Sequence, residues 1–399
     1  MMKNRLLKVR RATAPAMLIA AAALALPGPA QAAGYVGTVI ASGLDNPRGL
    51  AFGPDGALYV AEGGTFNTGG PIGVGGEGAA AYGESGAITR IQGGVQTRIL
   101  TGLPSFVNIA TGSAQGPQDI AFHEGVGYFL VGFGADPAIR YTDLGSEGGA
   151  AGLASLYSFN GTTVTKIADL GSFEQSVNPA NDHIESNPFH MVSGPSGLLV
   201  TDAAGNSLLN VTPGGQISTI AAFGGIGTFA PGGADYVPTG VAVGPDGAFY
   251  LGNLTGFPFT PGSAEIVRID ALTGEISSFG TGFTNITDIA WGTDGSLYAL
   301  QFADDGMLSG GTGSIRKLNA DGSHSLIFDG LVAPSGLEIG EDGAFYVTTF
   351  SPMPGQGQVM RIAQATGAVP EPASWALLVT GFGALGATLR RRRLEVAFS

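Results

Sequence analysis

Polar side chains recur at two positions of a pattern that this chain repeats six times. The best copies, Pro47–Val60 and Pro238–Leu251, each hold two short apolar segments around a Gly-Pro-Asp-Gly turn. Eight polar residues lie at or beside the start of the first segment, or directly after the second, and we predict that they line one binding site. They are Arg48, Glu62, Asp119, His190, Asp202, Asn253, Asp288 and Gln301.

These residue types suggest two kinds of chemistry. Carboxylate and amide oxygens bind hard cations such as Ca²⁺, and a carboxylate can also act as a general base in hydrolysis. Polar side chains that line a wet channel, or that join neighbouring units by backbone hydrogen bonds, need no ligand at all. The sequence assigns no catalytic residue, but it offers a candidate calcium site formed by Glu62, Asp202, Asn253 and Asp288.

The elements that would position these side chains are short strands. Each complete repeat divides into four apolar segments, which in the first copy are residues 49–52, 57–61, 87–91 and 95–100. Four-stranded units repeated at intervals of about 50 residues are typical of β-propellers. The sixth copy stops after three strands, and the N-terminal segment Tyr35–Ala41 supplies a candidate fourth. We therefore predict an all-β fold, a six-bladed β-propeller closed by an N-terminal strand.

Connection lengths give the predicted ring two different faces. The turns between the first and second strands are short, as are those between the third and fourth. The connections between the second and third strands, and those between repeats, are long. In a propeller these two longer types share one face, and elaborated loops on a rigid scaffold are where binding sites usually lie. The longer connections are residues 63–86, 104–116, 133–154, 171–187, 223–237, 254–264 and 302–312.

Composition narrows the classes of partner. The chain has 399 residues, 68 of them Gly, and no Cys, which excludes disulfides and thiolate metal sites. Between Ala33 and Val369 there are nine basic residues against twenty-nine acidic ones, a formal charge of −20. Such a surface repels polyanions, so we expect no nucleic-acid partner.

The two ends of the chain have the composition of export signals. Residues 1–32 combine a basic start, an apolar stretch and the small residues Ala30 and Ala32, which predicts a signal peptide cleaved by signal peptidase. After a linker at 364–369, residues 370–393 hold an apolar run that we expect to form a transmembrane helix and to insert transiently into the inner membrane. A short tail, 394–399, follows. The flanking motif residues are Pro370, Glu371, Pro372, Arg390, Arg391, Arg392 and Arg393.

This C-terminal arrangement resembles the PEP-CTERM sorting signal of Gram-negative bacteria. The resemblance implies an exosortase as a partner, cleavage near the motif, and delivery to the outer cell surface or the extracellular matrix. A permanent inner-membrane anchor is the alternative.

Residues 33–363, the predicted propeller, resemble the ScyD/ScyE family of exported NHL-like propellers. The likeness rests on stretches such as Leu44–Gly56, Gly116–Phe122, Val237–Gly247 and Gly282–Ile286. It implies a role connected with biosynthesis of the pigment scytonemin. It carries no catalytic residues over to this chain.

Two hypotheses of function follow from the sequence. The first is a non-catalytic surface or matrix scaffold whose loop-rich face binds a polysaccharide, a small molecule or a protein. The second is an exported metal-dependent hydrolase of the lactonase kind, or an accessory factor in pigment biosynthesis. Bound calcium would favour the hydrolase.

Overall fold

The computed structural model describes residues 34–66, 69–145, 149–224 and 234–365, all of which belong to one unit, Gln31–Ser399. The predicted signal peptide, with Ala30 and Ala32, lies outside the described residues, as do the PEP-CTERM motif and the short tail. None of the helices within the described ranges is long and apolar enough to cross a membrane.

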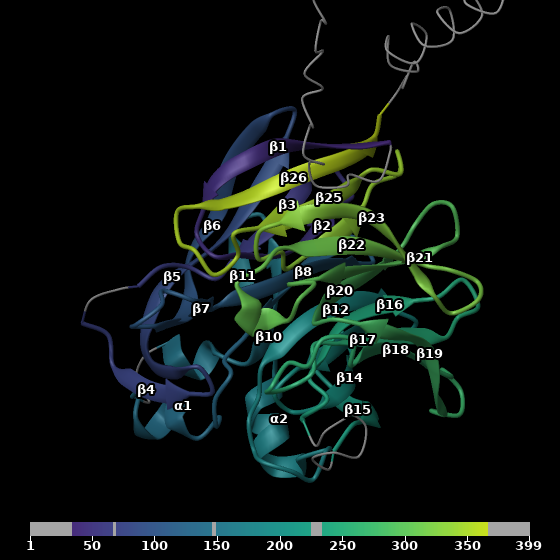
Figure 1. Cartoon of the computed structure of the whole chain (residues 1–399). Helices are drawn as coiled ribbons and strands as arrows, with labels where there is room; N and C mark the ends of the chain where they lie inside the picture. The colour runs from purple at the N-terminus through teal and green to yellow at the C-terminus, as the bar shows by residue number, and fades with distance from the viewer. Residues whose placement is uncertain (1–33, 67–68, 146–148, 225–233, 366–399) are drawn as a thin grey trace, which may run out of the picture. The chain divides into compact units, whose positions relative to one another are not determined.

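The described strands form six antiparallel sheets (Figure 1). The first sheet has the order β2 (Pro47–Phe52), β3 (Leu58–Glu62), β5 (Gly78–Gln92), β6 (Val95–Asn108) and β7 (Ala114–Gln115), with β4 (Ile72–Gly75) paired to β5. The second has the order β8 (Pro117–His123), β9 (Val126–Val131), β10 (Ser155–Asn160) and β11 (Thr163–Asp169). The third has the order β12 (Pro188–Gly194), β13 (Gly197–Asp202), β14 (Ser207–Val211) and β15 (Ile217–Ala222).

The remaining three sheets repeat this plan. The fourth has the order β16 (Pro238–Val243), β17 (Phe249–Asn253), β18 (Ala264–Ile269) and β19 (Ile276–Phe283). The fifth has the order β20 (Ile286–Trp291), β21 (Leu297–Gln301), β22 (Gly313–Leu318) and β23 (His324–Leu331). The sixth has the order β24 (Leu337–Ile339), β25 (Phe345–Thr349), β26 (Gly357–Gln364) and β1 (Tyr35–Leu44).

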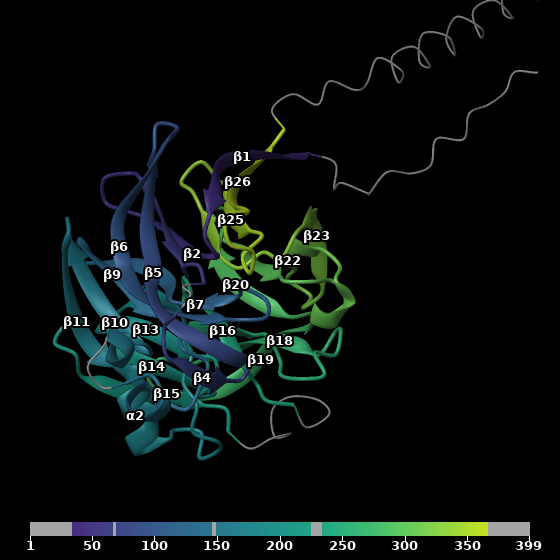
Figure 2. The same cartoon turned by 90° about the vertical axis from the view of Figure 1, so that its left-hand side faces the viewer.

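The first strands of the six sheets form a closed ring. β2 contacts β8, β8 contacts β12, and the contacts continue through β16, β20 and β24 back to β2. β1 completes the sixth sheet by pairing antiparallel with β26, as the sequence predicts, with Tyr35 opposite Gln364 (Figure 2). A ring of four-stranded sheets about one axis is the architecture of a β-propeller.

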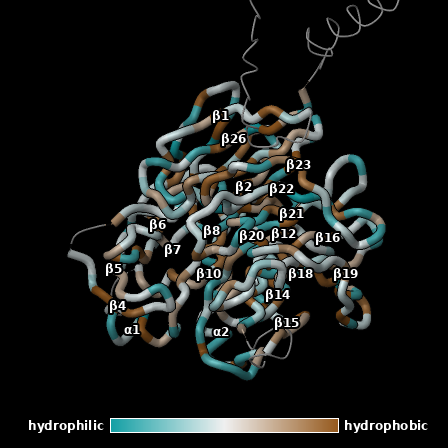
Figure 3. Tube along the Cα trace, viewed as in Figure 1, coloured by the Kyte–Doolittle hydropathy of each residue, from teal (hydrophilic) through white to brown (hydrophobic). Residues whose placement is uncertain are grey.

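Apolar side chains hold neighbouring sheets together. The buried residues form six clusters, each between two adjacent sheets, and in the first of them Ile88 and Phe129 join the first sheet to the second. The last cluster joins Leu44 and Val359 to Leu58 of the first sheet. Apolar residues accordingly follow the strands, while many outer turns are hydrophilic (Figure 3). The core is therefore distributed around the ring.

The short turns after the first strands are closed by their own aspartates. Asp55 accepts hydrogen bonds from Ala57 N at 3.2 Å and from Tyr59 Oη at 3.1 Å, and Gly56 adopts a φ of 71°. Asp246 and Asp294 repeat the contact to a tyrosine hydroxyl in the fourth and fifth sheets. These aspartates serve as turn residues, as Asp-Gly sequences usually do.

Several of the long connections contain secondary structure that the sequence did not predict. Residues 63–86 include β4 and the first part of β5, which pair as a hairpin. Residues 133–154 contain α1 (Ile139–Thr142) and the 3₁₀ helix η1 (Gly149–Gly152), and residues 302–312 contain η3 (Met307–Ser309). Helix α2 (Leu170–Val177) begins after Asp169, whose carboxylate accepts a hydrogen bond from Ser172 N, and so has an N-cap.

Candidate functional site

Three of the predicted site residues meet at the ring of first strands. The imidazole of His190 on β12 lies between two carboxylates: Nδ1 is 2.9 Å from Asp119 Oδ2 and Nε2 is 3.3 Å from Asp288 Oδ1. Asp119 comes from β8 and Asp288 from β20, so the contact joins three sheets. Each carboxylate also accepts a backbone hydrogen bond from the following sheet, Asp119 from Met191 N and Asp288 from Leu337 N, both at 2.7 Å.

In this trio, formed by Asp119, His190 and Asp288, electrostatics favour the protonated form of the His190 imidazole. Burial disfavours the charged ring, but Asp119 and Asp288 raise the pKa of His190 to about 10. Burial raises the pKa of Asp288 to about 7, although His190 opposes the change. Burial, together with Asp288 and Asp119, raises the pKa of the neighbouring Glu338 on β24 to about 8. Both ring nitrogens of His190 face carboxylates, which favours a structural role for the ring.

A cavity of about 320 Å³ follows the axis of the ring. All six first strands line it, and His190 and Glu338 are the ionisable groups among its described lining residues. Most of the other lining side chains are apolar, such as Leu50, Phe122 and Ile289. The trio therefore lies beside an apolar channel.

The predicted residues that follow the second strands are not part of the trio. Each makes hydrogen bonds with the loops of its own sheet. Glu62 accepts from Asp45 N and from the guanidinium of Arg98, whose Nη2 lies 2.6 Å from Glu62 Oε2. Asp202 accepts from Ser186 Oγ, from Asn187 N at 2.7 Å and from Gly205 N.

Asn253 and Gln301 make equivalent contacts in the next two sheets. Asn253 donates to Tyr236 O and accepts from Glu265 N, and Gln301 Oε1 accepts from Thr284 N at 2.9 Å. Thus Glu62, Asp202 and Gln301 each bind a backbone N–H of the connection that leads into their own sheet, and Asn253 binds a carbonyl oxygen there. This repeated contact holds the connection that leads into each of these four sheets, whether that connection is long or short.

The four residues of the candidate calcium site are not brought together as metal ligands. Within the described ranges, no group of three or more His, Asp or Glu side chains is arranged to hold a metal ion. Glu62 and Asp202 instead have protein donors at their carboxylate oxygens. The geometry of the described residues gives the calcium hypothesis no support.

Arg48, the remaining predicted residue, is buried beneath the long connections. Its Nη2 donates to Ala114 O at 2.7 Å, while its Nε has no hydrogen-bond partner. Burial lowers the pKa of Arg48, and the nearby carboxylate of Glu77 opposes the change. Arg48 is therefore a buried cation close to the group of loops described next.

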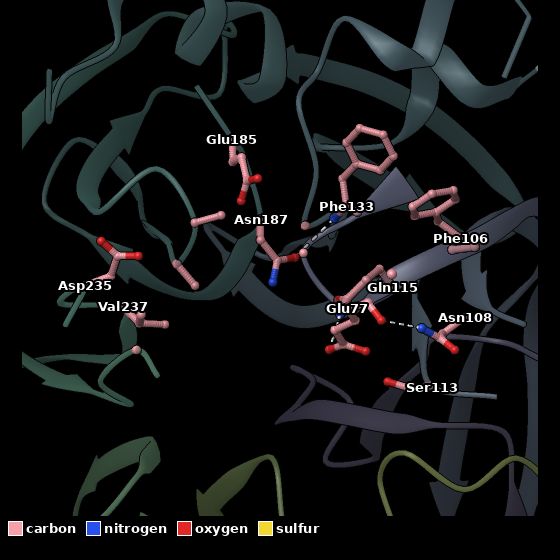
Figure 4. Close-up of a pocket in the computed structure, with 18 of the residues that line it drawn as sticks. Glu77, Phe106, Asn108, Ser113, Gln115, Phe133, Glu185, Asn187, Asp235 and Val237 are labelled. Carbon is pink, nitrogen blue, oxygen red and sulfur yellow. Dashed lines mark hydrogen bonds between the residues drawn. The ribbon is translucent and has the colours of Figure 1, made fainter. Parts of the chain in front are cut away.

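The long connections enclose a pocket of about 240 Å³ (Figure 4). It lies among the turn between β4 and β5, the ends of the loops that lead into β8, β12 and β16, and the loops that follow β9, β13 and β17. Four sheets therefore contribute to it. Its principal side chains are Glu77, Phe106, Asn108, Gln115, Phe133, His183, Glu185, Asn187, Asp235, Phe257 and Phe259.

Hydrogen bonds to the backbone fix several of these side chains. Asn187 Oδ1 accepts from Phe133 N at 3.1 Å, and Asn108 Nδ2 donates to Glu77 O at 2.7 Å (Figure 4). Gln115 Nε2 donates to Glu77 Oε1 at 3.4 Å, so the oxygen of the Gln115 amide points elsewhere. These contacts within the protein hold the polar side chains of the pocket in place.

Sequence reasoning selected the correct loops but missed the polar residues of the pocket. Glu77, Gln115 and Asn187 lie within or beside the long connections, where no repeat register identifies them. His183 lies in the long connection 171–187, and Phe257 and Phe259 lie in the long connection 254–264. The unusual length of residues 63–86 was the one signal for Glu77, because that insertion brings the β4–β5 turn to the pocket.

Comparisons with known proteins give similarity of structure only. No protein-family model matches the chain, and no curated protein matches its sequence. A gluconolactonase of Xanthomonas campestris is 11% identical, with a TM-score of 0.49, covering 82% of this chain and 89% of that one. The PQQ-bound aldose sugar dehydrogenase of Streptomyces coelicolor is 13% identical, with a TM-score of 0.49, covering 84% and 100%.

The WD40 β-propeller domain of Doa1 is also similar. It is 12% identical, with a TM-score of 0.43, and the match covers 84% of this chain and 98% of that domain. These values assign no activity to this chain, and its function has to be argued from its own residues.

Proposed function

We propose that this chain is an exported, surface- or matrix-targeted six-bladed β-propeller that acts as a ligand-binding scaffold. Each of the six sheets would be one blade, with β1 completing the last. The observation that carries the proposal is the pocket on the loop-rich face, which is lined by both aromatic side chains and fixed polar groups. Pockets that combine apolar walls with a few placed polar groups are typical ligand sites.

The two ends of the sequence support export. A signal peptide at residues 1–32 and a PEP-CTERM-like sorting segment at 370–393 would take the propeller through the inner membrane and to the cell surface. A link to pigment biosynthesis rests on the ScyD/ScyE resemblance alone. A lactonase-like metal centre finds no support in the described geometry, because Glu62 and Asp202 already have protein donors.

Filling the pocket tests the binding function. Ala204 lines the pocket, so Ala204→Trp should occupy it, whereas Ala271→Trp, on an exposed turn outside the pocket, is the matched control. Binding is measured by ligand-observed NMR of the purified full chain with a mixed library of small amines, sugars and aromatic alcohols.

The proposal predicts fragments that bind the wild type and Ala271→Trp but not Ala204→Trp. It is overturned if no fragment binds, or if the fragments that bind are indifferent to Ala204→Trp. Far-UV circular dichroism shows whether both variants keep the wild-type fold.

A further inference from the structure

We propose that the pocket takes a primary ammonium group carried on an apolar body, an inference that rests on the proposed binding function. Three features of the described residues lead to this class of ligand. They are three amide oxygens that lie close together, two of them without donors, an excess of carboxylates, and aromatic walls.

The amide oxygens gather beside Gly132, the residue before Phe133. A Cβ atom built on Gly132 would lie 2.8 Å from Asn187 Oδ1 and 3.3 Å from both Gln115 Oε1 and Gln118 Oε1. Gln115 and Asn187 line the pocket, whereas Gln118 is only 2% exposed and lies outside its lining; neither the Oε1 of Gln118 nor that of Gln115 has a hydrogen-bond partner. Two buried acceptors without donors carry a free-energy cost that a ligand with N–H groups would relieve.

An ammonium group fits this set better than a hydroxyl does. It has three donors and no acceptor, whereas a hydroxyl has a single donor. The Nε2 of Gln115 already donates to Glu77, so its oxygen is the atom left for the ligand. The three oxygens come from different elements, since Gln115 ends β7, Gln118 lies in β8 and Asn187 precedes β12.

The charge of the side chains that line the pocket also favours a cationic ligand. Glu77, Glu185 and Asp235 line it, and none of the described lining residues is Lys or Arg. Burial raises the pKa of Glu185; His183 opposes this, while Asp235, Asp136 and Asp182 raise it further. The three aspartates act against the charged form of Glu185, and a bound cation would favour that form.

Arg48, the main positive charge near the pocket, already has a hydrogen-bond partner in the protein. Arg48 is buried, and the carboxylate of Glu77 is close enough to raise the pKa of Arg48. The Nη2 of Arg48 donates to Ala114 O. His183 contributes a weak contact, with Nε2 3.9 Å from Glu185 Oε2. Glu185 and Asp235 therefore remain to attract a cationic ligand, and an anionic ligand would be repelled.

The apolar body has aromatic walls to contact. Phe106 and Phe133, both almost fully buried, pack against each other with ring centroids 5.1 Å apart, and the lining residues Phe257 and Phe259 are edge-to-face with ring centroids 6.2 Å apart. Phe257 is 74% exposed, which leaves most of its ring to be covered by a ligand. Aromatic faces also attract ammonium groups.

Three probes of one shape test the ligand class on the full chain. We compare 2-phenylethylammonium, which has charge and donors, with 2-phenylethyl-trimethylammonium, which has charge alone, and with 2-phenylethanol, which is neutral. Isothermal titration calorimetry should show the primary ammonium binding about tenfold more tightly than either of the others, because charge-assisted hydrogen bonds to several acceptors are lost in both.

Two variants locate the interaction. Gly132→Ala places a methyl group among the three oxygens and should abolish the preference for the primary ammonium, while Glu185→Gln should weaken both cations and leave the alcohol unchanged. Glu341→Gln, on an exposed turn outside the pocket, is the control and should leave all three affinities unchanged.

The outcomes separate this inference from the proposed function. Equal binding of all three probes, or the same order of affinity in Gly132→Ala, overturns the ammonium class and leaves a general binding pocket. Displacement of the ammonium by potassium chloride, beyond the effect of equal ionic strength of choline chloride, would show a site for a bare cation instead. If neither these probes nor any library fragment binds, both proposals fail.

Discussion

The Oδ1 atom of Asp119 occupies the space into which a side chain on Gly49 would project. A Cβ atom built on Gly49 would lie far inside van der Waals contact with that oxygen and 3.0 Å from Asp119 Cα. Gly49 lies in β2 and Asp119 in β8, so the first and second sheets approach each other as closely as they do because position 49 has no side chain. The absence of a Cβ here is a packing requirement.

Gly49→Ala should therefore destabilise the protein. The added methyl group cannot be accommodated unless β2 and β8 move apart, and overpacking of this kind costs about 1–3 kcal/mol. Urea denaturation followed by circular dichroism measures the loss. Gly214→Ala is the control, since a Cβ there would lie 3.9 Å from its nearest neighbour, Thr212 Oγ1. Equal stability of the two variants would contradict the close approach.

His190→Gln should cause a larger loss. The substitution removes the cation between Asp119 and Asp288 and leaves two buried carboxylates without their counter-charge. Breaking a buried ion pair from one side costs about 3–5 kcal/mol. The free energy of unfolding from urea titration is the measurement, with His183→Gln as the control, because His183 is exposed. A loss no greater than that of the control would show that the trio does not support the ring.

The trio and Glu338 should make stability decrease as the pH rises. The pKa of Glu338 rises from 4.5 to about 8, and that of Asp288 from 3.8 to about 7, so their neutral forms favour the folded state. Their contribution is complete below the unfolded-state pKa and is lost as the pH rises towards the folded-state pKa. His190, raised from 6.5 to about 10, adds stability below 6.5 that is lost as the pH rises through about 10.

Glu338→Gln should reduce this dependence on pH. The amide cannot ionise, so the variant should lose less stability than the wild type between about pH 5 and about pH 9, and should be the more stable of the two at the alkaline end. Thermal melting across this range provides the measurement. A variant whose melting temperature falls with pH as steeply as that of the wild type would exclude Glu338 as a contributor.

Removing β1 should prevent stable ring closure. A chain that begins at Asp45 leaves β26 as an unpaired edge and also removes Leu44 from the cluster that contains Val359. We expect no cooperative thermal transition, or one that occurs at a much lower temperature. A chain that begins at Tyr35 keeps the whole strand and should melt as a chain that begins at Ala33 does. Similar melting of both truncations would refute closure by β1.

Calcium should have no effect on thermal stability. The carboxylates of Glu62 and Asp202 accept several hydrogen bonds from the protein, and a metal would have to displace those donors. Equal melting temperatures with EDTA and with added Ca²⁺ are expected. Glu62→Gln should lower the melting temperature by the same amount in both solutions, because it weakens the contact with Arg98. A calcium-dependent rise that this variant abolishes would restore the metal site.

The ring could be read from the sequence because its signals are local and periodic. Turn residues and alternating apolar positions recur in each copy, and the unpaired segment at Tyr35 matched the missing strand of the last copy. The polar site was predicted less well. Alignment of the repeats placed Asp119, His190 and Asp288 at equivalent positions near the start of their strands. It could not show that the side chains of Glu62 and Asp202 contact the loops of their own sheets.

The residues of the pocket could not be predicted by aligning the repeats. Its residues come from insertions of different lengths, and their meeting depends on how each loop folds back over the ring. The contact between Gln115 and Glu77, for example, joins residues 38 positions apart through the β4–β5 hairpin. Its aromatic wall was visible only as a cluster of Phe and Pro near Phe257.

The pairing of β1 with β26 also determines how the molecule could be held. Tyr35 and Gln364, at the two described ends, line a hollow together with the short turns at Gly292 and Asp342. Those turns lie at the far ends of the first strands from the loops that form the pocket. A tether introduced at either described end would therefore leave the pocket facing away from the point of attachment. Mechanical load on a tether at the N-terminal end would act on the hydrogen bonds between β1 and β26, whereas β26 itself is paired on both sides, with β1 and β25.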